Sequence, residues 1–130
     1  MTSWSLASRR ATLVSRSAAE IARIGTALGG NERTFVGLAG IGGLMVASER
    51  RDSLDFRLGR LIGAGMALPE ASAQLGQPCD SPNMIRDAYG VTQAYGLRAP
   101  ILSALHRMVF GNNEVASALR ELLENPNFYE

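Results

Sequence analysis

The sequence predicts an all-α fold, and three observations support this prediction. Aromatic residues make up only 6% of the 130 residues and β-branched residues are sparse, whereas alanine and leucine recur throughout. No stretch alternates strictly between apolar and polar residues, as a half-buried strand would. Glycine, proline and asparagine recur at intervals that suit helix ends. The length and the 46% hydrophobic content further predict one compact domain over residues 1–130.

A long amphipathic helix is predicted over about residues 5–28. Apolar or small residues recur there every three or four positions, at Ala11, Val14, Ala18, Ile21, Gly25 and Leu28. Gly29 and Gly30 follow as a stop signal. On the other face, Arg16, Glu20 and Arg23 lie one turn apart and can pair with one another. We interpret this charged face as solvent-exposed.

The next segment combines a short helix with a glycine-rich turn. Asn31 is a suitable N-cap for a helix over residues 32–38. Four glycines crowd into the positions that follow, namely Gly37, Gly40, Gly42 and Gly43. A phosphate-binding glycine loop would require a preceding strand, and no strand pattern precedes these residues. We therefore interpret the glycines as a turn between two helices.

Five further helices are predicted downstream, each with an apolar stripe and recognisable end signals. Their expected spans are 54–63, 69–76, 81–96, 100–111 and 113–125. Proline opens three of them and glycine closes four. Ser81, followed by Pro82, is the expected N-cap of the third helix, and Asn113 that of the last. The chain then comprises six or seven helices joined by short turns.

The composition excludes several classes of function. A net charge of +1 lacks the positive excess that nucleic-acid binding needs. One cysteine and one histidine cannot form a disulfide or a structural zinc site. All basic residues are arginine, so the chain has no lysine amine for use as nucleophile or general base. No apolar run approaches the roughly twenty residues that span a membrane, and no secretory signal is apparent, so a cytoplasmic location is expected.

Few residues are candidates for chemistry on their own. His106 lies within a predicted helix without a second imidazole or a thiol at ligand spacing, and we interpret it as structural. Cys79 has no base beside it in the sequence. Residues 48–60 contain a cluster of mixed charges that can bind an anion through arginine forks and backbone N–H groups. The same cluster can form a solvated, self-paired loop, which is the interpretation we favour.

Several separated blocks together carry a family resemblance. They are ATLVSRSAAEIARIGTALGG at residues 11–30, TFVGLAGIGGL at 34–44, Ser53, LGQPCDS at 75–81 and RAPIL at 98–102. In order and in spacing they resemble the C-terminal domain of NAD(P)-dependent glycerol-3-phosphate dehydrogenases, over about residues 8–123. The resemblance implies an all-helical domain, of the type shared with the C-terminal domain of 6-phosphogluconate dehydrogenases.

The sequence departs from this family at functional positions. The family's catalytic lysine and its Rossmann domain, which binds NAD or NADP, precede the matched region, so no cofactor is expected in the isolated chain. The aspartate of the family's glycine turn is Gly43 here, and a threonine four residues later is Ala47. The family's serine-arginine-asparagine block grips the substrate and the nucleotide phosphate. Ser53 matches its serine, whereas Leu54 and Asp55 replace its arginine and asparagine.

The resemblance implies four candidate site residues. Ser53 and Asp55 are the substrate-binding candidates, and Arg57, one turn after Ser53, is a partial substitute for the missing arginine. Asp80 corresponds to a glutamate near the nicotinamide ribose and is the cofactor-binding candidate. Leu54 removes charge-assisted hydrogen bonds of roughly 1.5–3 kcal/mol each, and Asp55 adds a negative charge where a phosphate would bind. We therefore expect no binding of the family's substrate, and we assign no catalytic or metal-binding residue.

Two hypotheses for the function remain open. In the first, the chain is a stand-alone, degenerate domain without dehydrogenase activity, either a binding or assembly module or the remnant of a truncated gene. In the second, it is the substrate domain for a separate Rossmann chain, or it uses an inherited cleft for a non-redox reaction. That cleft would lie between residues 40–43, 53–57 and 77–81. In the family, the nucleotide-binding domain and the helix before the matched region would bury part of this domain's apolar surface. Because that surface would be uncovered in the isolated chain, we expect a homodimer or a partner protein chain.

Overall fold

A computed structural model of the protein describes residues 6–30, 50–111 and 115–124. These residues form six α-helices and no strand, which confirms the predicted all-α fold. The helices are α1 (Leu6–Ala27), α4 (Leu54–Gly63), α5 (Leu68–Leu75), α6 (Ser81–Ala94), α7 (Pro100–Phe110) and α8 (Val115–Glu124). Within this part of the chain, none of the helices is both long and apolar enough to cross a membrane.

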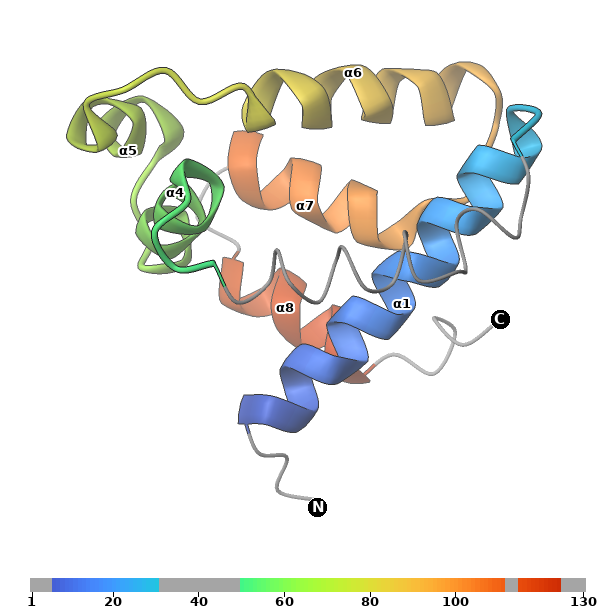
Figure 1. Cartoon of the computed structure of the whole chain (residues 1–130), viewed down its shortest axis with the longest axis horizontal. Helices are drawn as coiled ribbons and strands as arrows, with labels where there is room; N and C mark the ends of the chain where they lie inside the picture. Colours follow the sequence, from blue (N-terminus) through green and yellow to red (C-terminus); the bar gives the residue numbers. More distant parts are fainter. Residues whose placement is uncertain (1–5, 31–49, 112–114, 125–130) are drawn as a thin grey trace.

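Helix α7 occupies the centre of the arrangement. It packs between α6 and α8, and α1 crosses both α7 and α8. Helices α4 and α5 pack against each other at the opposite end from the C-terminus of α1, and α4 also contacts α8 (Figure 1). Segments distant in the sequence, such as α1 and α8, are thereby brought side by side.

A cluster of buried apolar side chains joins α4, α5 and α7. It consists of Leu58, Ile62, Ala71, Leu75 and Val109. The two residues from α4 are four positions apart, as are the two from α5, so each pair lies on one face of its helix. Val109 belongs to α7, so apolar contacts hold α4 and α5 against the rest of the fold.

The ends of the helices follow the local signals in the sequence. Ser53 caps α4, because its hydroxyl oxygen accepts a hydrogen bond from the Phe56 N–H at 3.1 Å. Gly76 closes α5 in the left-handed conformation, with φ of 74°. Ser81, by contrast, is the first residue of α6, and Asp80 takes the N-cap position without a side-chain capping bond. The prediction that Ser81 is the N-cap was wrong by one residue, and its hydroxyl donates to another helix instead.

The prediction for the faces of α1 was partly wrong. Arg16 and Glu20 are buried, with exposed fractions of 8% and 5%, although they were expected on a solvated face. Conversely, Ile21 and Leu28, expected to point inward, are exposed. The reason is that α7 and α8 cover the charged face of α1, and their backbone ends bind the two charged side chains. Arg23 is exposed and pairs with Glu20 at 3.8 Å, as predicted.

Several predictions fall outside the described residues. They concern the Asn31 cap with the helix over 32–38, the glycine turn with Gly43, Ala47, the Asn113 cap, and the end of the last helix at Asn125.

Candidate functional site

Three polar side chains from distant segments meet near the start of α4. Asp55 lies in the first turn of α4, Cys79 in the loop between α5 and α6, and Ser81 at the start of α6. The Ser81 hydroxyl donates a hydrogen bond to Oδ1 of Asp55. The Cys79 thiol donates to the same oxygen at 3.3 Å and lies 3.7 Å from Oγ of Ser81. The segments 53–57 and 77–81 therefore adjoin each other, as expected for two walls of the predicted cleft.

These three side chains form a hydrogen-bonded contact, and we do not interpret them as a catalytic group. A cysteine or serine nucleophile needs a base within reach, most often an imidazole or an amine. The sequence contains no lysine and a single histidine, His106, which is held elsewhere. Its ring stacks on Tyr89 with centroids 4.1 Å apart and lies 5.0 Å from the ring of Phe110. Both donors of the trio are directed at Asp55, so the carboxylate ties α4 to α6.

The other candidate residues are placed as follows. Ser53 is half-buried, and its hydroxyl oxygen is engaged as the α4 cap. Leu54, which the resemblance matches to the family's arginine, packs against the apolar cluster. Arg57 and Asp80 are both exposed. Thus the segment that resembles the substrate-binding block presents one carboxylate to its polar neighbours, and its leucine turns toward the core.

No pattern in the sequence predicted the contact between Asp55 and the loop. Asp55 and Cys79 are separated by 24 positions, and Ser81 lies two further on. A residue pattern along one helix cannot show which loop will pack against it. The resemblance to the family did indicate that these segments converge, but it gave no information about the bonding of Asp55.

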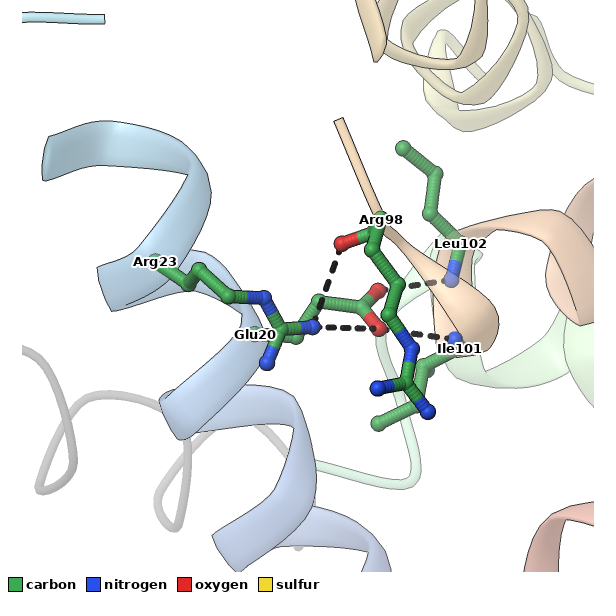
Figure 2. Close-up of polar contacts among 5 residues, drawn as sticks. All are labelled: Glu20, Arg23, Arg98, Ile101 and Leu102. Atoms are coloured by element: carbon green, nitrogen blue, oxygen red, sulfur yellow. Dashed lines mark hydrogen bonds and ion pairs between the residues drawn. The ribbon is translucent and has the colours of Figure 1, made fainter. Parts of the chain in front are cut away.

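A second polar cluster, on α1, was missed by sequence reasoning (Figure 2). The two carboxylate oxygens of Glu20 accept hydrogen bonds from the backbone N–H groups of Ile101 and Leu102, each at 2.8 Å. Arg23 donates a hydrogen bond at 3.1 Å to the carbonyl oxygen of Arg98, which lies two residues before α7. Glu20 therefore serves as the cap of a helix that begins 80 residues later in the sequence than Glu20 itself.

Arg16, one turn before Glu20, makes a corresponding contact with α8. Its guanidinium donates to the carbonyl oxygen of Leu122, in the last turn of that helix. Carbonyl groups at a helix C-terminus have no hydrogen-bond donor within the helix, and a buried arginine there supplies one. Arg16 and Glu20 are therefore residues that position α7 and α8 on α1.

A surface pocket of about 200 Å³ lies between α7 and α8. Its apolar wall includes Ala104, Ala118 and Leu122. Arg107 and Glu121 also line it and form an ion pair with an N–O distance of 2.8 Å. Both of these side chains are about half exposed, so their mutual attraction is weakened by solvent. The pocket shares no residue with the Asp55 trio.

Comparisons with known proteins identify the family of this chain. Residues 5–120 match the family described as NAD-dependent glycerol-3-phosphate dehydrogenase C-terminus. The chain is 35% identical over 121 residues to glycerol-3-phosphate dehydrogenase (NAD(P)+) of Bacillus subtilis strain 168, and 36% identical over 121 residues to that of Bacillus velezensis. These alignments cover 93% of the chain and 35% of each relative.

A more distant bacterium provides a similar match. Glycerol-3-phosphate dehydrogenase (NAD(P)+) of Edwardsiella ictaluri is 32% identical over 117 residues, which cover 90% of the chain and 35% of the relative. No solved structure matches the chain at a comparable level of significance. The chain thus spans about a third of the length of the curated relatives it matches. The chain belongs to the family of NAD-dependent glycerol-3-phosphate dehydrogenases, in which it corresponds to the C-terminal domain.

Proposed function

We propose that this chain is a binding or assembly domain of the glycerol-3-phosphate dehydrogenase type that does not itself transfer hydride. The observation that carries this proposal is the position and hydrogen bonding of the Asp55 carboxylate. Its carboxylate lies in the first turn of α4 and accepts hydrogen bonds from Ser81 and Cys79. A substrate phosphate approaching the start of α4 would meet this negative charge, and the two nearby donors are already engaged by it.

The neighbouring residues support the same conclusion. Leu54 packs against the apolar cluster and has no charge to offer a phosphate. Ser53 uses its oxygen as the helix cap. Hydride transfer also requires a bound nicotinamide and a group that moves the hydroxyl proton. The family resemblance assigns the proton transfer to a lysine, and these 130 residues contain no lysine.

Two broader expectations belong to this proposal. We infer that the 130 residues form a single domain, which is supported by the match of the family over residues 5–120. We also infer that the protein acts in the cytoplasm, because no apolar run in these 130 residues approaches the roughly twenty residues that span a membrane.

The activity assay tests the proposal directly. The purified 130-residue chain is mixed with dihydroxyacetone phosphate and NADH or NADPH, or with glycerol 3-phosphate and the oxidised nucleotide, and the absorbance of the reduced nicotinamide is followed. We expect no change that scales with protein concentration. The G43D/L54R variant should also be inactive, because neither substitution supplies a base or a nucleotide site. Turnover by the purified wild-type chain would refute the proposal.

A binding experiment separates loss of the phosphate site from loss of the nucleotide site. Glycerol 3-phosphate is titrated into the labelled chain while backbone amide shifts are recorded. We expect no saturable shift in the wild type, and a saturable response around residues 53–57 and 77–81 in L54R/D55N. The control D52N removes an exposed carboxylate that lies before α4 and should behave like the wild type. Activity that appears only after addition of a separate nucleotide-binding chain would favour the alternative, a substrate domain acting in trans.

A further inference from the structure

The pocket between α7 and α8 has room for a small organic molecule. Its apolar lining includes Ala104 of α7 and Ala118 and Leu122 of α8, each of which is at most 6% exposed. Because two of these three side chains are alanine, the two neighbouring helices leave a space between them (Figure 1). The volume of about 200 Å³ corresponds to roughly seven water molecules in the liquid.

Polar groups that line the same pocket retain hydrogen-bonding capacity. The ion pair between Arg107 and Glu121 joins Nη2 of the guanidinium to Oε2 of the carboxylate. A guanidinium has five N–H donors and a carboxylate has two acceptor oxygens. Within the described residues, this contact leaves the other donors of Arg107 and Oε1 of Glu121 for another molecule. The half-buried Ser103 adds a hydroxyl group to the lining.

The charges at the pocket are complementary to a molecule that carries both signs. A ligand that satisfies both Arg107 and Glu121 needs a negative and a positive group close together, since the two side chains are 2.8 Å apart. A free α-amino acid has this arrangement, because its carboxylate and its ammonium are attached to the same carbon atom. An apolar side chain on that carbon matches the apolar lining of the pocket.

We propose that the α7–α8 pocket binds a free α-amino acid with a short apolar side chain. The ligand's carboxylate accepts hydrogen bonds from Arg107, and its ammonium donates to Glu121. Its side chain packs against Ala104, Ala118 and Leu122. The ligand then lies antiparallel to the ion pair of the protein, so each of its charges is nearest to the opposite charge and the protein's own pair stays intact.

Ligands with a single charge fit this pocket less well. A simple anion bound to Arg107 would be repelled by Glu121, and a simple cation bound to Glu121 would be repelled by Arg107. Both charged side chains are about half exposed, so solvent weakens their attraction for any ligand. We therefore expect a dissociation constant on the order of 1 mM for the amino acid. The proposal goes beyond the proposed function, because it assigns a ligand class to a pocket that lies apart from the Asp55 trio.

The first test uses L-valine and two analogues that each lack one of its charges. L-Valine, isovalerate and isobutylamine are titrated separately into the labelled 130-residue chain at constant pH and ionic strength, and backbone amide shifts are recorded. With valine we expect saturable shifts that are largest at residues 100–107 and 118–122. Each analogue should bind at least about fivefold more weakly. A valine titration without saturable shifts at these residues, or an analogue that binds as well as valine, would overturn the proposal.

The second test assigns the two ends of the ligand to their residues. R107Q and E121Q should each weaken the binding of valine about fivefold, because each removes one charged partner. R120Q and E124Q are the matched controls, since they remove the same charges from exposed positions of α8 that do not line the pocket. Both controls should bind valine like the wild type. Unchanged affinity in R107Q and E121Q, or an equal loss in the controls, would contradict the proposed contacts.

The outcomes of these tests are separable from those of the activity assay. Hydride transfer by the purified chain would refute the proposed function, and valine binding at α7 and α8 would still support the pocket. Absence of valine binding would refute the pocket and leave the proposed function as it is. The titration with glycerol 3-phosphate also differs from that with valine, because it reports on residues 53–57 and 77–81, none of which lines the pocket.

Discussion

Glu20 shows how much one side chain determines in this fold. Its carboxylate is buried and accepts two backbone hydrogen bonds from the first turn of α7. The spacing of Arg16, Glu20 and Arg23 predicted their mutual pairing, and that prediction is confirmed for Glu20 and Arg23. Burial was mispredicted, because the pattern along α1 cannot show that helix ends with unsatisfied N–H and C=O groups will pack on its charged face.

The first prediction concerns the removal of this carboxylate. E20A leaves two backbone N–H groups without their charged acceptor, so the free energy of unfolding should fall by about 3 kcal/mol. E121A is the matched control, since Glu121 forms an ion pair with Arg107 in which both side chains are about half exposed. Its cost should stay below about 1 kcal/mol. Urea denaturation followed by circular dichroism measures both, and equal losses would contradict the capping role of Glu20.

Local sequence patterns predicted one part of the candidate site and could not predict another. Ser53 was identified from the family block, and its position before a helical stripe agrees with the cap that it forms. The bonding of Asp55 to Cys79 and Ser81 depends on the packing of α4 against the α5–α6 loop. No residue near Asp55 in the sequence encodes that packing. The cleft stays a prediction, and the titration with glycerol 3-phosphate tests it.

At the scale of the elements, helix ends were predicted well because their causes are local. Proline occupies the first turn of α5, α6 and α7, where its missing N–H costs nothing. The structure also places the left-handed glycine Gly76 directly after α5, as the sequence indicated. The exposure of Met84, Val91 and Tyr95 on α6 was not predicted. A stripe of apolar residues indicates a helix face, but its width does not show how much of it a neighbour will cover.

The second prediction contrasts two glycines. Gly76 has a φ of 74°, so G76A should lower the free energy of unfolding by about 1 kcal/mol through backbone strain alone, since no atom lies within 4 Å of an added Cβ. Gly59 lies inside α4 with equally open surroundings. G59A should therefore raise stability by about 0.5–1 kcal/mol. Thermal unfolding of both variants checks the signs, and destabilisation by G59A would contradict this account of α4.

At the scale of the whole molecule, the apolar cluster of α4, α5 and α7 makes cooperative unfolding the expected behaviour. Leu75 is almost fully buried in this cluster. L75A should cost about 2–5 kcal/mol, because it removes apolar contacts and leaves a cavity. L28A removes the same side chain from an exposed site and should cost much less.

Calorimetry then provides the check on cooperativity. In wild type and in L75A, the calorimetric and van't Hoff enthalpies of unfolding should agree, as in a two-state transition. Two separate transitions, one for α4 with α5 and one for the remaining helices, would show that Val109 does not couple them.

The two buried charges of α1 also specify the direction in which its neighbours run. Arg16 meets the carbonyl end of α8, and Glu20 meets the amide end of α7. Each side chain thereby complements the macrodipole of its neighbour, which is fixed by the polarity of the backbone. An ordinary ion pair survives when its two charges are exchanged, but a backbone cannot exchange its ends. R16E/E20R would keep the composition and net charge of the protein. It would nevertheless place an acidic side chain at the carbonyl end of α8 and a basic side chain at the amide end of α7. The free energy of unfolding should therefore fall by as much in the double variant as in either single variant.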